Sequence, residues 1–128
     1  MGMFDWYQPS ASFNCPSCGR PLSDWQGKDG PNALLVWREG AAAPVDQRVD
    51  DDVQGLASTI AALRLPAEFI IYTTCCGRFP VEAICATESE TWMRTRLAEP
   101  ADVDRMHYAD PREVRDARKR QLSQRSAG

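Results

Sequence analysis

The segment that decides the predicted fold is CPSCGRPL, at residues 15–22. Its two cysteines, Cys15 and Cys18, stand three residues apart in a turn that Pro16 and Gly19 favour. Cysteines at this spacing are typical of one half of a tetrahedral zinc site, in which each thiolate binds the ion at about 2.3 Å. The segment therefore predicts a zinc-ribbon-like turn and a second pair of ligands elsewhere in the chain.

The best candidate for the second pair is Cys75-Cys76-Gly77, because it repeats the Cys-Gly ending of the first turn. A full second turn would have a cysteine at position 73, where the chain has Thr73. Adjacent residues of a strand point to opposite faces, so the two cysteines can share one ion only if the backbone bends there. The predicted ligands of a structural Zn²⁺ ion are Cys15, Cys18, Cys75 and Cys76.

Two other residues could complete the site in place of Cys75 or Cys76. Cys85 is a possible ligand, although a free thiol buried in a β-sheet core is equally ordinary. His107 is the chain's one histidine and is interpreted as a surface residue. A thioredoxin-like redox role for the first pair is disfavoured, because such motifs begin a helix and Pro21 argues against one.

The chain has 128 residues, the size of one domain, and five cysteines, an odd number that fits poorly with paired disulfides. Its opening residues 1–6 lack the basic leader and apolar core of a secretory signal. The longest apolar run, at 33–37, is far shorter than the roughly 20 residues that span a bilayer. We therefore expect a soluble cytoplasmic protein with no membrane partner.

The order of apolar residues and turn signals predicts an α+β fold, with a small antiparallel zinc-ribbon-like β-sheet, one central helix and a C-terminal helix. Apolar spacing indicates the central helix over 53–63, and Asp110-Pro111 is typical of the start of the last helix. Residues 1–108 are predicted to form a single β-rich domain, and 109–128 a basic C-terminal helix or tail. The predicted strands are 33–37 and a three-stranded meander at 68–74, 81–87 and 91–97.

Charge is divided unevenly along the chain. Residues 1–110 carry a net charge of −7 and residues 111–128 a net charge of +4. The basic tail predicts an alternative role, contact with a nucleic acid, although the acidic body argues against it. The residues of this alternative site are Arg112, Arg115, Arg118, Lys119 and Arg120.

Aromatic residues recur along the chain and are usually core residues in small β-rich domains. An exposed recognition surface is the other interpretation. We expect Trp6 and Trp25, which flank the first cysteine turn, to be the most exposed of them.

Three stretches of the chain are similar to segments of known proteins. They are residues 1–6, residues 25–30 with Leu34-Leu35, and residues 69–72 leading to 81–83. They resemble small, uncharacterised bacterial proteins that open with a Met-Gly-Met-Phe-Asp motif and carry an aromatic-Gln-x-Lys-Asp element. The resemblance covers about the first 100 residues and implies a compact β-rich fold. The resemblance implies no activity. The cysteines depart from the sequence pattern of these bacterial proteins, which indicates a zinc-binding branch of the group.

The leading hypothesis from the sequence is a non-enzymatic, zinc-stabilised cytosolic protein that interacts with a protein partner. The alternative is a nucleic-acid-associated zinc ribbon that uses the basic tail. A thiol or metal-dependent enzyme is a third hypothesis, disfavoured because four protein ligands leave no open zinc position.

Overall fold

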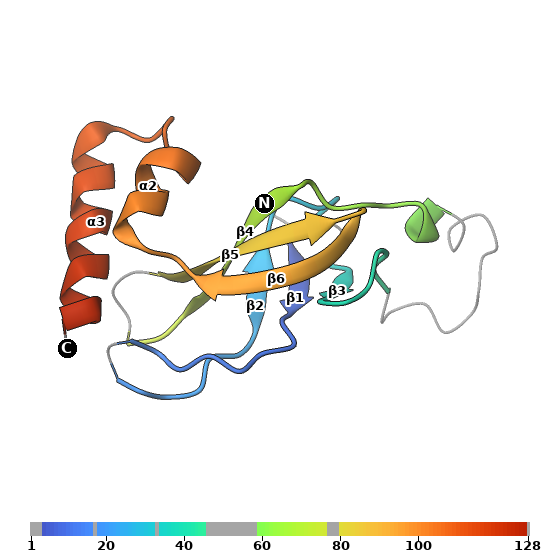
Figure 1. Cartoon of the computed structure of the whole chain (residues 1–128), viewed down its shortest axis with the longest axis horizontal. Helices are drawn as coiled ribbons and strands as arrows, with labels where there is room; N and C mark the ends of the chain where they lie inside the picture. The colour runs from blue at the N-terminus through green and yellow to red at the C-terminus, as the bar shows by residue number, and fades with distance from the viewer. Residues whose placement is uncertain (1–3, 17, 33, 46–58, 77–79, 128) are drawn as a thin grey trace.

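The computed structural model describes residues 4–16, 18–32, 34–45, 59–76 and 80–127 (Figure 1). Its main element is one six-stranded sheet with the strand order β3-β1-β2-β4-β5-β6. The strands are β1 (Asp5–Gln8), β2 (Trp25–Gly27), β3 (Val36–Arg38), β4 (Glu68–Thr74), β5 (Pro80–Glu88) and β6 (Thr91–Leu97). Two helices follow, α2 (Pro100–Met106) and α3 (Arg112–Ala127).

The sheet is mixed, because β1 pairs in parallel with β3 and antiparallel with β2. The long strands β4, β5 and β6 form an antiparallel meander, and β2 joins it to the N-terminal strands through the pair Gln26 and Tyr72. The sheet curls into a half-barrel. At its open side the Gly40 N–H donates to the carbonyl oxygen of Trp92 at 2.7 Å, so the chain after β3 contacts the start of β6.

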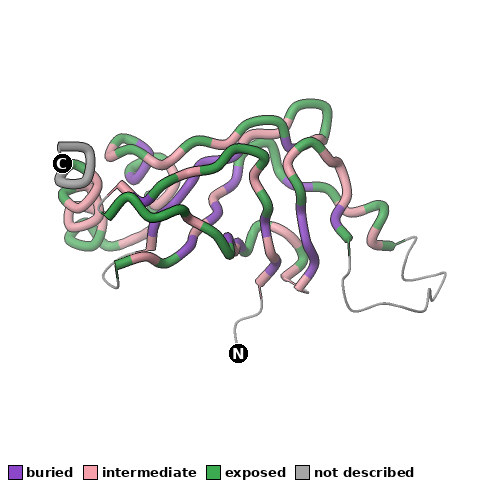
Figure 2. The backbone as a smooth tube through the Cα atoms, turned by 90° about the horizontal axis from the view of Figure 1, so that it is seen from below, coloured by how far each residue is buried: buried purple, intermediate pink, exposed green. Residues whose placement is uncertain are grey.

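The core lies inside this curl, and Figure 2 shows buried segments along the strands. Four buried aromatic rings from four strands meet there, with centroid distances of 5.5–6.4 Å. Aromatic pairs at such distances are stabilised beyond the area that they bury. Tyr7 is the common member of three of the four pairs. The rings belong to Tyr7, Trp37, Phe69 and Trp92.

A fully buried carboxylate, that of Asp5, holds the segment before β3 against β1. It accepts hydrogen bonds from the backbone N–H groups of Asn32 and Leu35, at 3.2 and 3.1 Å, and from the Trp37 indole N–H at 3.0 Å. Buried carboxylates need such donors to offset the loss of water. Asp5 thus fixes a loop that contains the left-handed residues Asn32 and Leu34, with φ of 59° for both.

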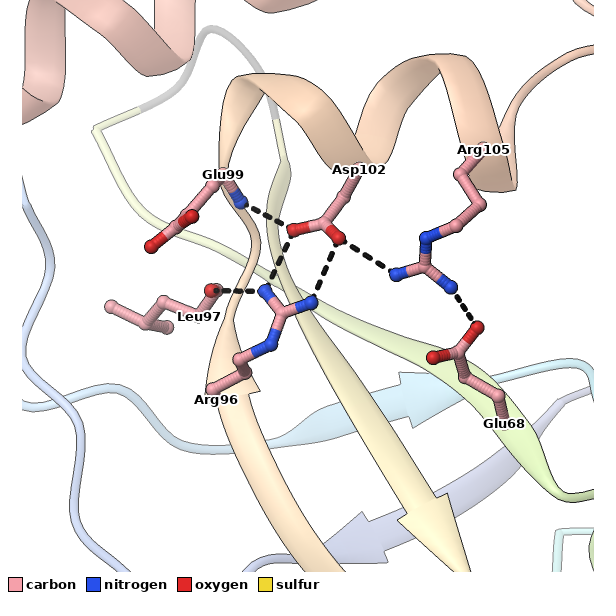
Figure 3. Close-up of polar contacts among 6 residues, drawn as sticks. All are labelled: Glu68, Arg96, Leu97, Glu99, Asp102 and Arg105. Atoms are coloured by element: carbon pink, nitrogen blue, oxygen red, sulfur yellow. Dashed lines mark hydrogen bonds and ion pairs between the residues drawn. The ribbon is translucent and has the colours of Figure 1, made fainter.

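Helix α2 packs against the outer face of the β4–β6 meander, and one acidic residue attaches it there (Figure 3). The buried Asp102 carboxylate accepts two hydrogen bonds from Arg96 of β6, at 2.7 and 2.8 Å, and one from Arg105 at 2.8 Å. It also accepts the backbone N–H of Glu99 at 2.8 Å, which caps the start of the helix. Arg105 in turn pairs with Glu68 of β4.

The predicted fold class is wrong. The sheet is a single mixed sheet of six strands rather than a small antiparallel zinc ribbon, because two short strands at 5–8 and 25–27 extend the meander. The predicted strand at 33–37 is displaced to Val36–Arg38. Residues 53–58 of the predicted central helix lie outside the described residues. Residues 59–61 are helical, and the described chain has no central helix packed on the sheet.

The C-terminal region also differs from the prediction, since it contains two helices where one was expected. Pro100, which follows β6 closely, occupies the first turn of α2. Proline is tolerated there because the first helical N–H groups have no partner within the helix. In the part of the chain that the structure describes, no helix is long and apolar enough to cross a membrane.

Candidate metal centre

The first cysteine pair lies in a tight hairpin turn between Phe13 and Leu22. The Cys15 N–H donates to the Arg20 carbonyl oxygen at 2.8 Å, and the Gly19 N–H donates to the Cys15 carbonyl oxygen at 2.9 Å. Gly19 has a φ of 76°, in the left-handed region that glycine adopts without strain. The turn therefore brings Cys15 and Cys18 to one side of the hairpin.

The second pair follows directly after β4, which ends at Thr74. Cys76 has a φ of 64°, an uncommon left-handed conformation for a residue with a side chain. This bend removes the strand alternation that would send Cys75 and Cys76 to opposite faces. The neighbouring Gly77 lies outside the described residues.

The two turns are held against each other by contacts next to the cysteines. The Thr73 hydroxyl of β4 donates to the Ser23 carbonyl oxygen at 2.5 Å, although the two residues are 50 positions apart. Phe13 and Leu22 on the first hairpin, and Cys75 on the second turn, pack against the buried core. The side chain at position 73, where a full second turn would have a cysteine, therefore serves to anchor the first turn.

The four predicted ligands form one compact cluster, in which all four Sγ atoms lie within 4.8 Å of one another. The Sγ–Sγ distance is 3.4 Å for Cys18 and Cys75, 3.8 Å for Cys15 and Cys76, and 3.7 Å for Cys75 and Cys76. Cys15 is buried, whereas Cys18 and Cys76 are exposed. A cluster of this kind could hold a metal ion.

The close contact of the thiols changes their pKa values in opposite directions. Donation from the Arg20 backbone N–H lowers the pKa of the Cys18 thiol. Hydrogen bonding to Cys18 raises the pKa of Cys75, and it raises that of Cys76 to about 12. One thiol is thus favoured as a thiolate at the expense of its neighbours, so a bound cation is required for all four to be ionised together.

Neither alternative ligand belongs to the cluster. Cys85 is fully buried in β5, where it pairs with Phe69 and Thr95, and burial raises the pKa of its thiol to about 12. His107 ends α2, with Nε2 2.9 Å from Glu82 Oε2 and Nδ1 3.3 Å from Asp110 Oδ2.

The basic residues of the alternative nucleic-acid site are only partly available. Arg115 and Lys119 both pair with Asp104 of α2, at 3.3 and 2.6 Å. Arg118 pairs with the buried Glu82 of β5 at 3.0 Å. Three of the five positive charges therefore attach α3 to the rest of the chain, while Arg112 and Arg120 are exposed.

The fold and this site define a small protein with a mixed, curled β-sheet and a four-cysteine cluster able to bind a metal ion. No protein-family model, curated protein or solved structure matches the chain. The resemblance to small bacterial proteins accordingly stays a prediction.

Proposed function

We propose that this chain is a zinc-stabilised, non-enzymatic interaction protein of the bacterial cytosol, in which Cys15, Cys18, Cys75 and Cys76 hold one structural Zn²⁺ ion. The main support for this proposal is the spacing of the four sulfur atoms. Four sulfurs at about 2.3 Å from one ion form a tetrahedron with edges of about 3.8 Å. The Sγ–Sγ distances of 3.4, 3.7 and 3.8 Å lie close to that value.

The spacing favours a single ion over a polynuclear cluster. In a polynuclear cluster the thiolates bind different metal atoms, so some sulfur pairs lie further apart than the edge of one tetrahedron. Tetrahedral sites with four sulfur ligands are typical of zinc and of iron–sulfur proteins. Zinc is the usual ion of a closed structural site with four thiolate ligands.

A closed site has a structural role. Four protein thiolates fill the tetrahedral shell, so no position is left for a water or a substrate. The centre joins the hairpin turn at 13–22 to the end of β4. The hydrogen bond from Thr73 to Ser23 and the packing of nearby apolar side chains against the core also hold these two segments together. Metal binding and the folding of this region are therefore coupled.

A protein partner fits the charge distribution better than a nucleic acid does. The body of the chain is acidic, and Arg115, Arg118 and Lys119 are already paired with carboxylates of the same chain. Nucleic-acid binding depends on unpaired cations that displace counterions from phosphates.

Titration of metal-free protein with Co²⁺ tests the metal centre directly, because Co²⁺ in a tetrahedral thiolate site has characteristic visible absorption. We expect these bands to saturate at one ion per chain and to disappear on addition of one equivalent of Zn²⁺. Cys85→Ser is the matched control and should titrate as the unchanged protein does. Absence of the thiolate bands would contradict the proposal.

A further inference from the structure

The four cysteines of the cluster differ in their access to solvent. Cys15 is buried and Cys75 is half-buried, whereas Cys18 and Cys76 are exposed. Cys75 also lines a groove of about 370 Å³ beside the first hairpin turn. A small solute can therefore reach a sulfur atom on each of the two turns.

The exposed Cys18 and the half-buried Cys75 are close to bonding distance. Their Sγ atoms lie 3.4 Å apart, compared with 3.8 Å for Cys15 and Cys76 and 3.7 Å for Cys75 and Cys76. The sulfur atoms of a disulfide lie about 2.05 Å apart, so closure requires an approach of about 1.4 Å. Rotation of two cysteine side chains and a small adjustment of an exposed turn can supply this movement.

The other pairs are less suited to form a disulfide. Consecutive Cα atoms are about 3.8 Å apart across a trans peptide, whereas the Cα atoms of a disulfide usually lie about 4.4–6.8 Å apart, which disfavours Cys75 with Cys76. A bond from Cys15 to Cys18 or Cys76 requires an oxidant to reach Cys15, which is only 3% exposed. The geometry therefore favours Cys18 and Cys75 as the first pair to react.

Contacts at the base of the turns hold them near each other without using the sulfur atoms. The Phe13 ring, at the start of the first hairpin, contacts the Trp25 ring at a centroid distance of 6.3 Å. Contrary to the prediction from sequence, Trp25 is buried, because adjacent residues of β2 face opposite sides and Gln26 takes the outer face. The hydrogen bond that Thr73 donates joins the second turn to the same hairpin. These contacts remain when an ion leaves the cluster.

We propose that Cys18 and Cys75 form a reversible oxidation site, at which a peroxide links the two residues by a disulfide and the metal ion is released. The inference rests on the proposed function, since it names the response of the metal centre to an oxidant. The disulfide joins residues 57 positions apart, on the same two turns that the ion joins. One cross-link therefore replaces another. Thiols are the stable form in a reducing cytosol, so the disulfide forms under oxidising conditions.

Hydrogen peroxide supplies the oxidising equivalents. The Cys18 thiolate attacks one peroxide oxygen, the O–O bond breaks, and the other oxygen takes a proton and leaves as water. The Cys75 thiolate then attacks the sulfur of the sulfenic acid, so that the S–S bond forms, the S–O bond breaks and a second water leaves with a second proton. The two sulfurs lose two electrons in total, and the peroxide gains them. Only two thiolate ligands then remain, too few to retain the ion.

The test is treatment of zinc-loaded protein with hydrogen peroxide, with the released zinc measured by a colorimetric chelator. We expect one zinc ion to be released and two thiols to be lost per chain. Mass spectrometry of a digest should identify a disulfide between Cys18 and Cys75. Dithiothreitol and added zinc should restore both the thiols and the bound ion.

Variants separate this pair from the other sulfur atoms. Cys76→Ser keeps Cys18 and Cys75, so it should form the same disulfide in peroxide, whereas Cys75→Ser should not. Both are compared by mapping of thiols and disulfides, because each variant also lacks a metal ligand. Cys85→Ser is the matched control, since Cys85 is buried outside the cluster, and it should release zinc at an unchanged rate.

Zinc content measured before oxidation separates the two proposals. Zinc-loaded protein that keeps its ion and its thiols in peroxide would overturn the oxidation site and leave the metal centre intact. A disulfide mapped to Cys15, or sulfinic acid at Cys18 in place of a disulfide, would overturn it as well. Protein that contains no zinc but forms the disulfide between Cys18 and Cys75 would contradict the metal centre and support the pairing.

Discussion

The Thr73 hydroxyl donates a hydrogen bond of 2.5 Å to the Ser23 carbonyl oxygen, and this contact joins the end of β4 to the segment that follows the first cysteine turn. The first cysteine pair ends five residues before Ser23, and the second pair begins two residues after Thr73. The bond therefore helps to hold the two halves of the cysteine cluster at a fixed distance from each other.

Replacing Thr73 with valine tests this role. Thr73→Val keeps the shape of a buried side chain and removes the donor, so we expect the free energy of unfolding to fall by about 1 kcal/mol. Metal affinity, measured by competition with a chelator, should fall as well. Thr87→Val is the control, because the Thr87 hydroxyl donates to the Pro66 carbonyl oxygen on an exposed part of the sheet. An equal loss of metal affinity in both variants would contradict the account.

The five cysteines should separate into two classes on substitution. Cys18→Ser and Cys75→Ser each remove a thiolate from the cluster, so metal content should fall well below one ion per chain and the protein should melt at a lower temperature. Cys85→Ala leaves the cluster intact and removes a buried sulfur, so it should cost about 1 kcal/mol of stability with metal content unchanged. Loss of metal from the Cys85 variant would contradict this assignment and indicate that Cys85 is a ligand.

The buried carboxylate of Asp5 should be essential to the N-terminal part of the sheet. Asp5→Asn places an amide N–H group among three N–H donors, so we expect the free energy of unfolding to fall by about 3 kcal/mol. Urea unfolding measures the change. Asp24→Asn, at an exposed position, should have little effect, and equal midpoints for the two variants would contradict the importance of the buried carboxylate.

The Asp102 network predicts a specific pH dependence. Hydrogen bonds from the Arg96 guanidinium hold the pKa of the Asp102 carboxyl well below its usual range. A carboxyl with a lowered pKa in the folded state contributes stability above its unfolded pKa of about 3.9 and loses it as the pH falls through the folded pKa. Asp102→Asn should therefore cost about 2 kcal/mol above pH 5, and less as the pH falls below about 4.

Urea unfolding over a pH series checks this prediction. Glu113→Gln, which changes an exposed carboxylate on α3, should show no comparable dependence on pH. A cost of Asp102→Asn that stays constant from pH 7 to pH 2 would show that the ionised form of Asp102 does not stabilise α2.

The sequence predicted the cysteine cluster well because the signals for it are local. Pro16 and Gly19 shape the first turn whatever the rest of the chain does, and Gly19 adopts the left-handed conformation that such turns use. The bend that Cys75 and Cys76 require also follows from local geometry. That Thr73 anchors the first turn could not be predicted, because its partner is a backbone carbonyl 50 residues away.

The fold was harder to predict because half of the sheet consists of short strands. β1, β2 and β3 have three or four residues each, too few for a period of two to be recognised. Their stability comes from long-range contacts such as Asp5 with Trp37. The meander was predicted at 68–74, 81–87 and 91–97 and is present, because those strands are long and their turns carry clear signals.

The central claim is that one zinc ion holds the two cysteine turns together. The most direct test is elemental analysis of protein purified without added metal, followed by thermal melting with and without a chelator. The account predicts one tightly bound zinc ion per chain and a lower melting temperature when the chelator removes it. Protein that contains no zinc, and that melts identically with and without the chelator, would contradict the claim.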